Sequence, residues 1–109
     1  MQTFAFLFRS DATLNPEALA RRNAAAREWA LARQRDGSLR HASPLEDGGF
    51  TVAEGATTTL SRGEVAAVLV IEAKDLGSAI ELATKHPGLA FGTRIEVRPV
   101  KVVAPSATS

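Results

Sequence analysis

The spacing of aromatic, apolar and polar residues predicts two strands of different kinds. Over residues 3–8, large aromatic and smaller side chains alternate strictly, which places Phe4, Phe6 and Phe8 on one face of a strand. The stretch from Val65 to Ala73 is almost continuously apolar instead, which is typical of a strand buried on both faces. We therefore expect the phenylalanine face to pack under a helix and the second strand to lie in the middle of a sheet.

Boundary residues predict two helices. Asn15 followed by Pro16 supplies a capping side chain and a proline at the first helical position, so a long helix should begin there. It should run to about Arg35 and end near Asp36-Gly37, because glycine readily takes the left-handed conformation that ends helices. Asp75 caps a second, shorter helix. Its apolar stripe, expected to face the core, consists of Leu76, Ala79, Ile80 and Ala83.

Further β segments complete the plan. A short strand is expected from Ser38 to Ser43, and a hairpin from Phe50 to Val52 and from Thr57 to Leu60. A last strand from Thr93 to Arg98 alternates again. The order is then β-α-β-β-α-β with an inserted central hairpin. This order predicts the ferredoxin-like α+β fold, an antiparallel sheet with both helices on one side.

The predicted fold leaves one face of the sheet without a helix. The central strand from Val65 to Ala73 sends apolar side chains to both faces, so the uncovered face needs a partner. The economical partner is the same face of a second copy, so we predict a homodimer through the sheet face. The threonine-rich hairpin is expected at an edge or against the other subunit.

Composition narrows the class of protein. The 109 residues fit one domain, expected over residues 1–103 and followed by a short tail over 104–109. No apolar run has the length of a membrane span and no export signal is visible, so we expect a cytoplasmic protein without a membrane partner. The chain has no cysteine and two histidines, which is a poor set of metal ligands. We therefore expect neither a metal site nor a cofactor.

A cluster of arginines raises the question of nucleic-acid binding. Six arginines are concentrated in one segment: Arg21, Arg22, Arg27, Arg33, Arg35 and Arg40. The net charge is only +1, however, whereas nucleic-acid-binding proteins usually show a stronger basic excess with interleaved aromatic residues. The pattern favours a solvated helix face over a nucleic-acid interface.

Residues towards both ends of the chain carry a family resemblance. Towards the N-terminus they are Phe4 to Arg9 and Pro16 to Leu19, with Trp29 later in the helix, and towards the C-terminus Glu81 to Gly88 and Ile95 to Val100. Together they resemble the YCII-related (YciI-like, DGPF) family. The resemblance implies a dimeric α+β barrel assembly, and an association with alternative sigma factors, near which such proteins are often encoded.

The chain departs from this family at its motif positions. The DGPF motif should fall between Thr59 and Val65, where this sequence has LSRGE. The histidine and aspartate proposed as an acid/base pair in the YciI branch correspond here to Ala18 and His86. The resemblance therefore implies a fold without the family's proposed pair.

The two histidines are the candidate acid/base residues, because imidazole titrates near neutral pH. His86 follows the second helix, whose C-terminal dipole should favour the protonated ring. His41 lies near Asp47 in sequence. A lyase or isomerase that works without a metal would use His86 or His41 with a carboxylate such as Asp47, within about 3 Å and in a cleft of the dimer.

Binding without catalysis is the interpretation that the sequence favours first. A cleft between the phenylalanine strand, the long helix and the hairpin can accept a small organic anion, with Arg9, Arg22 or Arg94 as its charge partner. On the inner side of the helix, either the arginines lie along the edges of the packed face, or Arg22 and Asn23 face a polar cleft. The sequence thus predicts a non-catalytic small-ligand-binding or regulatory module, with the enzyme as the alternative.

Overall fold

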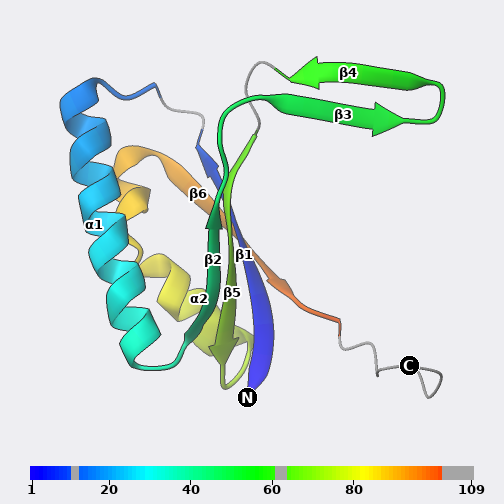
Figure 1. Cartoon of the computed structure of the whole chain (residues 1–109). Coiled ribbons are helices and arrows are strands. Elements are labelled where there is room, and N and C mark those ends of the chain that lie inside the picture. The colour runs from blue at the N-terminus through cyan, green and yellow to red at the C-terminus, as the bar shows by residue number, and fades with distance from the viewer. Residues whose placement is uncertain (11–12, 61–63, 102–109) are drawn as a thin grey trace, which may run out of the picture.

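The computed structural model describes residues 1–10, 13–60 and 64–101, so the expected tail and most of the segment in place of the DGPF motif lie outside the described residues. The elements in chain order are β1 (Gln2–Ser10), α1 (Pro16–Arg35), β2 (Leu39–Pro44), β3 (Gly49–Ala53), β4 (Ala56–Leu60), β5 (Val65–Ala73), α2 (Leu76–Thr84), the 3₁₀ helix η1 (Pro87–Phe91) and β6 (Thr93–Pro99). Both helices lie on one side of the sheet (Figure 1). The ferredoxin-like α+β plan with an inserted hairpin is confirmed.

The main sheet has four antiparallel strands in the order β2-β5-β1-β6. The apolar strand β5 is an inner strand, as its composition predicts, and β1 is the other inner strand. Their register places Phe6 opposite Leu69 on one side and opposite Val97 on the other. Alternate residues of four strands therefore form one continuous apolar layer beneath the helices.

The hydrophobic core lies between this layer and α2. Phe4, Phe6 and Ile71 are fully buried within it. The predicted stripe of α2 is only half right, because Ala79 and Ala83 are buried while Leu76 and Ile80 are 43% and 46% exposed. The two alanines bring the helix close to the sheet, and this geometry turns the larger neighbouring side chains outward.

The long helix α1 has the boundaries that its sequence predicts. Asn15 caps it, its side-chain oxygen accepting a hydrogen bond from the Ala18 N–H at 2.7 Å. After Arg35 the chain turns at Gly37, whose φ of +85° favours glycine. No residue of α1 is fully buried, and the helix packs mainly on η1 and β2. It is therefore held beside the sheet by its neighbours, with Trp29 as its one large side chain against the core.

The 3₁₀ helix η1 was not anticipated from the sequence, which indicated only the end of α2 near Pro87-Gly88. His86 is its N-terminal capping residue, and Gly92 ends it with a φ of +85°. The element joins α2 to β6 and contacts α1. It therefore places His86 inside the molecule rather than at a free helix end.

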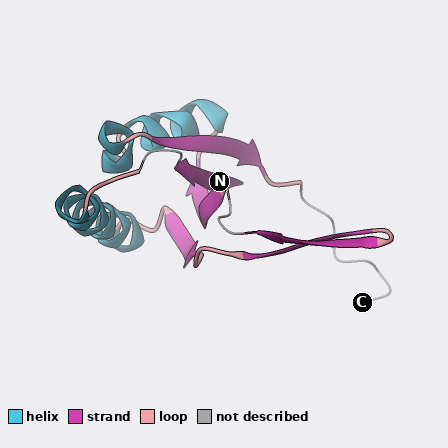
Figure 2. Ribbon diagram, turned by 90° about the horizontal axis from the view of Figure 1, so that it is seen from above, coloured by secondary structure: helices cyan, strands magenta, loops and turns pink. Residues whose placement is uncertain are grey.

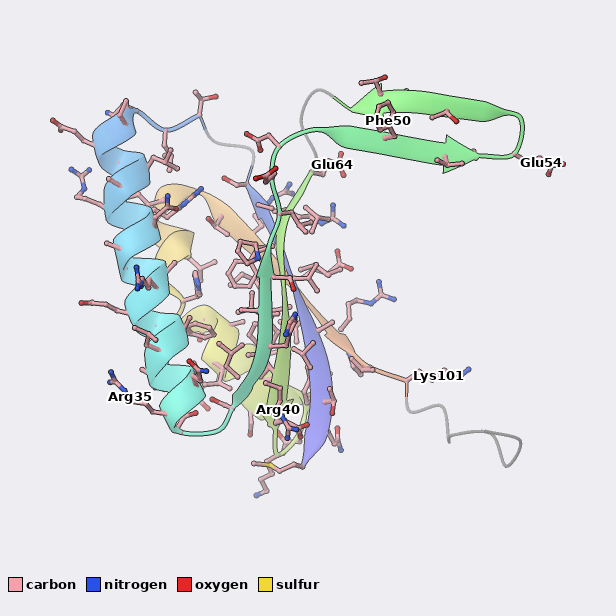
Figure 3. All side chains as sticks on the ribbon, in the orientation of Figure 1. Arg35, Arg40, Phe50, Glu54, Glu64 and Lys101 are labelled. Atoms are coloured by element: carbon pink, nitrogen blue, oxygen red, sulfur yellow. The ribbon has the colours of Figure 1, made fainter. Side chains whose placement is uncertain are left out.

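The other side of the sheet carries no helix, as Figure 2 shows from above. On this open face, four apolar side chains of the inner strands, Ala5, Leu7, Val68 and Val70, are half-buried or partly exposed. Among the described residues, the hairpin of β3 and β4 makes no extensive contact with another element, and it reaches away from the helices in both views. Phe50 lies on this hairpin at a distance from the main sheet (Figure 3), and it is 68% exposed.

None of the described helices combines the length and the apolar character that crossing a membrane requires. Within the same part of the chain, no three histidine, aspartate or glutamate side chains are grouped so as to hold a metal ion.

Candidate functional site

A pocket of about 340 Å³ lies between α1 and the helix-covered face of the sheet. Small side chains create the space, because Ala26 and Ala30 of α1 line it opposite Ala42 and Ala67 of the sheet. Since α1 packs on η1 and β2, the alanines do not close against the strands. The gap between helix and sheet is thus a cavity rather than part of the core.

Polar side chains gather where β1 ends and the first turns of α1 pass over it. We call the residues Ser10, Arg22, Asn23 and Thr93 the polar end of the pocket. The half-buried Arg22 donates from Nη1 to Ser10 Oγ at 3.4 Å and from Nη2 to Asn23 Oδ1 at 3.1 Å. Of the two placements considered for Arg22 and Asn23, the structure shows the one facing a cleft. The guanidinium is held in place, and it offers a positive charge to a ligand.

His86 lies in the wall of the pocket and is only 5% exposed. Its Nδ1 accepts a hydrogen bond from the Gly88 N–H at 2.9 Å. The ring packs edge-on against Phe8 and Trp29, with ring centroids 4.6 Å and 4.7 Å away. These contacts come from a strand, a helix and the turn after α2, so the position of the imidazole depends on the whole fold.

Burial lowers the pKa of His86 from 6.5 to about 4. This direction is opposite to the one expected from the helix C-terminus before it. The expectation was wrong because the ring is enclosed by apolar groups, and the cost of burying a cation exceeds the influence of a helix dipole. At neutral pH, His86 is therefore uncharged.

Gly88 is a site residue that sequence reasoning missed. A Cβ at this position would lie 2.9 Å from His86 Nδ1 and 3.0 Å from Thr93 Oγ1, closer than side chains tolerate. Only glycine lets the backbone N–H approach the imidazole as it does. Pro87-Gly88 was interpreted as a helix end, and the sequence carries no signal that the glycine also faces a pocket.

Trp29 packs against the core and also forms part of the pocket wall. Its indole N–H is buried and has no hydrogen-bond partner among the described residues. The indole and His86 rings meet at an interplanar angle of 65°. Together with Phe8, they give the pocket an aromatic wall suited to a flat ring.

The other acid/base candidates lie elsewhere. His41 is exposed on the edge strand β2, and its Nε2 is 2.6 Å from Ser43 Oγ. Asp47 is exposed in the loop between β2 and β3. Neither lines the pocket with His86, and the described residues that line it include no carboxylate.

The three candidate arginines are also separated. Of these three, only Arg22 lines the pocket. Arg9 lies on the open face, where it forms ion pairs with Glu64 at 3.1 Å and Glu96 at 3.3 Å. Arg94 is exposed on β6 at the position opposite Arg9. The predicted cleft between β1 and α1 is present, but the hairpin contributes no residue to it among those described.

Comparison with known proteins supports the fold. No protein-family model matches the chain, and no curated protein matches it in sequence. Solved structures do match it in fold, among them the two described next.

Muconolactone isomerase has a similar fold. Its crystal structure aligns over 98% of this chain and 96% of its own, with a TM-score of 0.64 and 19% identity. A second match is 5-chloro-2-hydroxyhydroquinone dehydrochlorinase from Burkholderia phenoliruptrix AC1100, in complex with 2,5-dihydroxybenzoquinone. It covers 93% of this chain and 95% of its own, with a TM-score of 0.61 and 14% identity. Both matches support the ferredoxin-like α+β fold, while the dimeric barrel assembly and the YCII-related family stay predictions.

Proposed function

We propose that the protein is a small-ligand-binding module whose pocket between α1 and the sheet accepts a small cyclic organic anion. The observation that carries this proposal is the arrangement of one arginine at the polar end of an aromatic-walled pocket. Arg22 supplies the charge, and Phe8 and Trp29 supply flat apolar surface. The volume of about 340 Å³ lies at the small end of the range for ligand pockets, so a single ring with its substituents fits.

The absence of carboxylates from the described lining supports an anion in particular. Arg27 also lines the pocket, so the charged side chains that face a ligand there are positive. An apolar cavity with this charge favours a ring that carries an acidic group, because Arg binds carboxylates through paired hydrogen bonds. The ring compound in the dehydrochlorinase structure makes 2,5-dihydroxybenzoquinone a reasonable probe alongside benzoate.

Calorimetric titration with benzoate and 2,5-dihydroxybenzoquinone tests this function. We expect Arg22→Met to weaken binding by about 10- to 100-fold, the effect of removing one charge-assisted hydrogen-bond donor. Arg21→Met is the matched control, since Arg21 is exposed on the same helix and does not line the pocket. Failure of both probes to bind, or equal affinity of the two variants, would contradict the proposal.

Catalysis is the second candidate function. It is favoured by the fact that both proteins of similar fold are enzymes, an isomerase and a dehydrochlorinase. The protein would then be a lyase or isomerase that works without a metal, with His86 as its acid or base. Incubation with muconolactone, followed by ultraviolet absorbance, tests for turnover. If the enzyme assignment is right, His86→Phe should abolish the turnover. If the unaltered protein binds the ligand but does not turn it over, the enzyme assignment is wrong and the binding function stays.

We also propose that the open face pairs with the same face of a second copy. Its apolar centre is bordered by charges of both signs, including the ion pairs of Glu96 with Arg9 and Arg98. A two-fold axis places such a mixed border against itself without net repulsion. The projecting hairpin provides further surface for this pairing. An isolated two-stranded hairpin is only marginally stable, so contact with a second copy would stabilise it.

Sedimentation velocity tests the pairing. Leu7→Asp buries a charge in the proposed interface and should shift the protein to monomer at micromolar concentration. Leu31→Asp on α1 is the control, because Leu31 is 41% exposed and lies away from the open face. A monomer before mutation, or equal effects of both changes, would contradict the homodimer. A cytoplasmic location, expected from the sequence, and a sigma-factor partner, implied by the YCII-related resemblance, stay expectations.

A further inference from the structure

The proton of the neutral His86 ring has a defined position. A backbone N–H can only donate, so the 2.9 Å contact from Gly88 requires Nδ1 to be an unprotonated acceptor. In the neutral ring, the hydrogen is then on Nε2. The edge-on contacts with Phe8 and Trp29 hold the ring plane, so the ring does not exchange its two nitrogens by turning over.

We propose that His86 serves the pocket as a fixed hydrogen-bond donor, through Nε2–H, and selects ligands that present an acceptor oxygen. This inference rests on the proposed function, since it describes the ligand of the same pocket. It defines a class of ligand with two features. One is an acidic group paired with Arg22, and the other is a carbonyl or similar acceptor oxygen on the ring that meets His86.

A base role conflicts with the same contacts. To take up a proton, the ring must become a cation whose Nδ1–H would face the Gly88 N–H, two donors against each other. The charged side chains that line the pocket beside it, Arg22 and Arg27, are positive and oppose a further positive charge. No described carboxylate lines the pocket to compensate. The surroundings therefore maintain His86 as a neutral donor.

Gly88 and Thr93 act as positioning residues for this donor. The space that a Gly88 side chain would need is occupied by His86 Nδ1 and Thr93 Oγ1. Thr93 is buried at the first position of β6, and it lines the pocket as well. The close packing of these three residues holds the backbone N–H against the imidazole and so determines which nitrogen is left for a ligand.

Nitrogen-detected or long-range ¹H–¹⁵N NMR tests the tautomer without any ligand. His41→Gln removes the other histidine, so the spectrum reports on one ring. We expect Nδ1 to show the shift of an acceptor nitrogen and Nε2 that of a protonated one, nearly unchanged between pH 8 and pH 6. A ring protonated on Nδ1, or a cation at neutral pH, would overturn the donor assignment whether or not the pocket binds anything.

Two acids that differ by one acceptor test the selection. The probes are 4-oxocyclohexanecarboxylate and cyclohexanecarboxylate, and the variants are His86→Gln, whose amide keeps a donor, and His86→Phe, which keeps only the ring. The unaltered protein and His86→Gln should prefer the oxo acid by about 2- to 10-fold, the value of one hydrogen bond. His86→Phe should bind both acids equally.

The outcomes separate the two proposals. A preference for the oxo acid that persists in His86→Phe would overturn the donor role while leaving the binding function intact. Failure of the unaltered protein to bind either acid would overturn the proposed ligand class and count against the binding function, while the NMR measurement still decides the tautomer.

Discussion

The two faces of the sheet are built from the same strands but have different surroundings. On the helix-covered face, Phe4 and Phe6 of β1 are fully buried. On the open face, Ala5 and Leu7 of the same strand are only half-buried within one chain. Strict alternation in the sequence determines which residues share a face. It does not reveal what covers a face, because that depends on elements far away in the chain or on another molecule.

The two faces also treat charge in different ways. The covered face holds His86 without a counter-ion among the described residues, and burial lowers the pKa of the ring to about 4. On the open face, hydrogen bonds from Arg98 and the nearby Arg9 lower the pKa of Glu96, which keeps its charge. One face therefore favours the neutral form of its titratable group and the other favours the ionised form.

The largest expected effect compares neighbouring residues of β1. Phe6→Ala should lower the free energy of unfolding by about 3–5 kcal/mol, because it opens a cavity in the core. Leu7→Ala on the open face should cost about 1 kcal/mol at a protein concentration low enough to keep the chain monomeric. Urea unfolding measures both values. An equal loss for the two variants would show that the open face is already buried within one chain.

Acid should weaken the covered face through His86. The ring has its ordinary pKa of 6.5 when unfolded and about 4 when folded, so between these values only the unfolded chain binds the proton. Stability should therefore be fully present above pH 6.5 and fall by about 2–3 kcal/mol as the pH drops towards 4. Urea unfolding at pH 7.5, 6 and 5 measures this fall.

His86→Phe is the control for this pH dependence, since it keeps an aromatic ring in the same place without a titrating nitrogen. The variant should lose much less stability over this pH window than the unaltered chain does. Identical slopes for the two proteins would show that groups other than His86 cause the acid sensitivity.

Gly88→Ala should cost about 1–3 kcal/mol, because the new methyl group must displace His86 or Thr93 from close contact. Gly77→Ala is the matched control. A Cβ there would lie 3.5 Å from Asp75 Oδ1, an ordinary contact, and alanine favours the helix by up to about 1 kcal/mol. Thermal unfolding should therefore show shifts of opposite sign. A neutral Gly88→Ala would mean that the imidazole site tolerates expansion.

The smallest effect is expected on the open side. Replacing residues 49–60 with a short glycine-serine linker should change the free energy of unfolding of the monomer by less than about 1 kcal/mol, because the hairpin makes no extensive contact with another element among the described residues. Urea unfolding at low protein concentration measures it. A loss comparable to that of Phe6→Ala would show that the hairpin belongs to the core fold.

Much of the fold could be predicted because its signals are local. The cap at Asn15, the turn at Gly37 and the apolar strand β5 act over a few residues, and the structure has each of them where the sequence indicates. The inward face of α2 was predicted less well. There, side-chain size rather than hydrophobicity determined which side of the helix could approach the sheet. The alanines are therefore buried in the core, and Ile80 is not.

The candidate site could be predicted only in part. Arg22 and His86 were among the candidates and both line one pocket, whereas Arg9 and His41 have partners elsewhere. The burial of His86 arises from η1 and from the position of α1 beside the sheet, neither of which has a local signature. The helix-dipole rule alone therefore predicted the wrong direction for its pKa.

The position of α1 beside the sheet separates what stabilises the protein from what determines the size of its ligand. The largest fully buried side chains belong to β1 and β5, while Ala26 and Ala30 on α1 determine how much room remains in the pocket. Enlarging either alanine changes the cavity without opening the core. A protein of this kind can thus acquire a new ligand by single substitutions on one helix, at little risk to its folding.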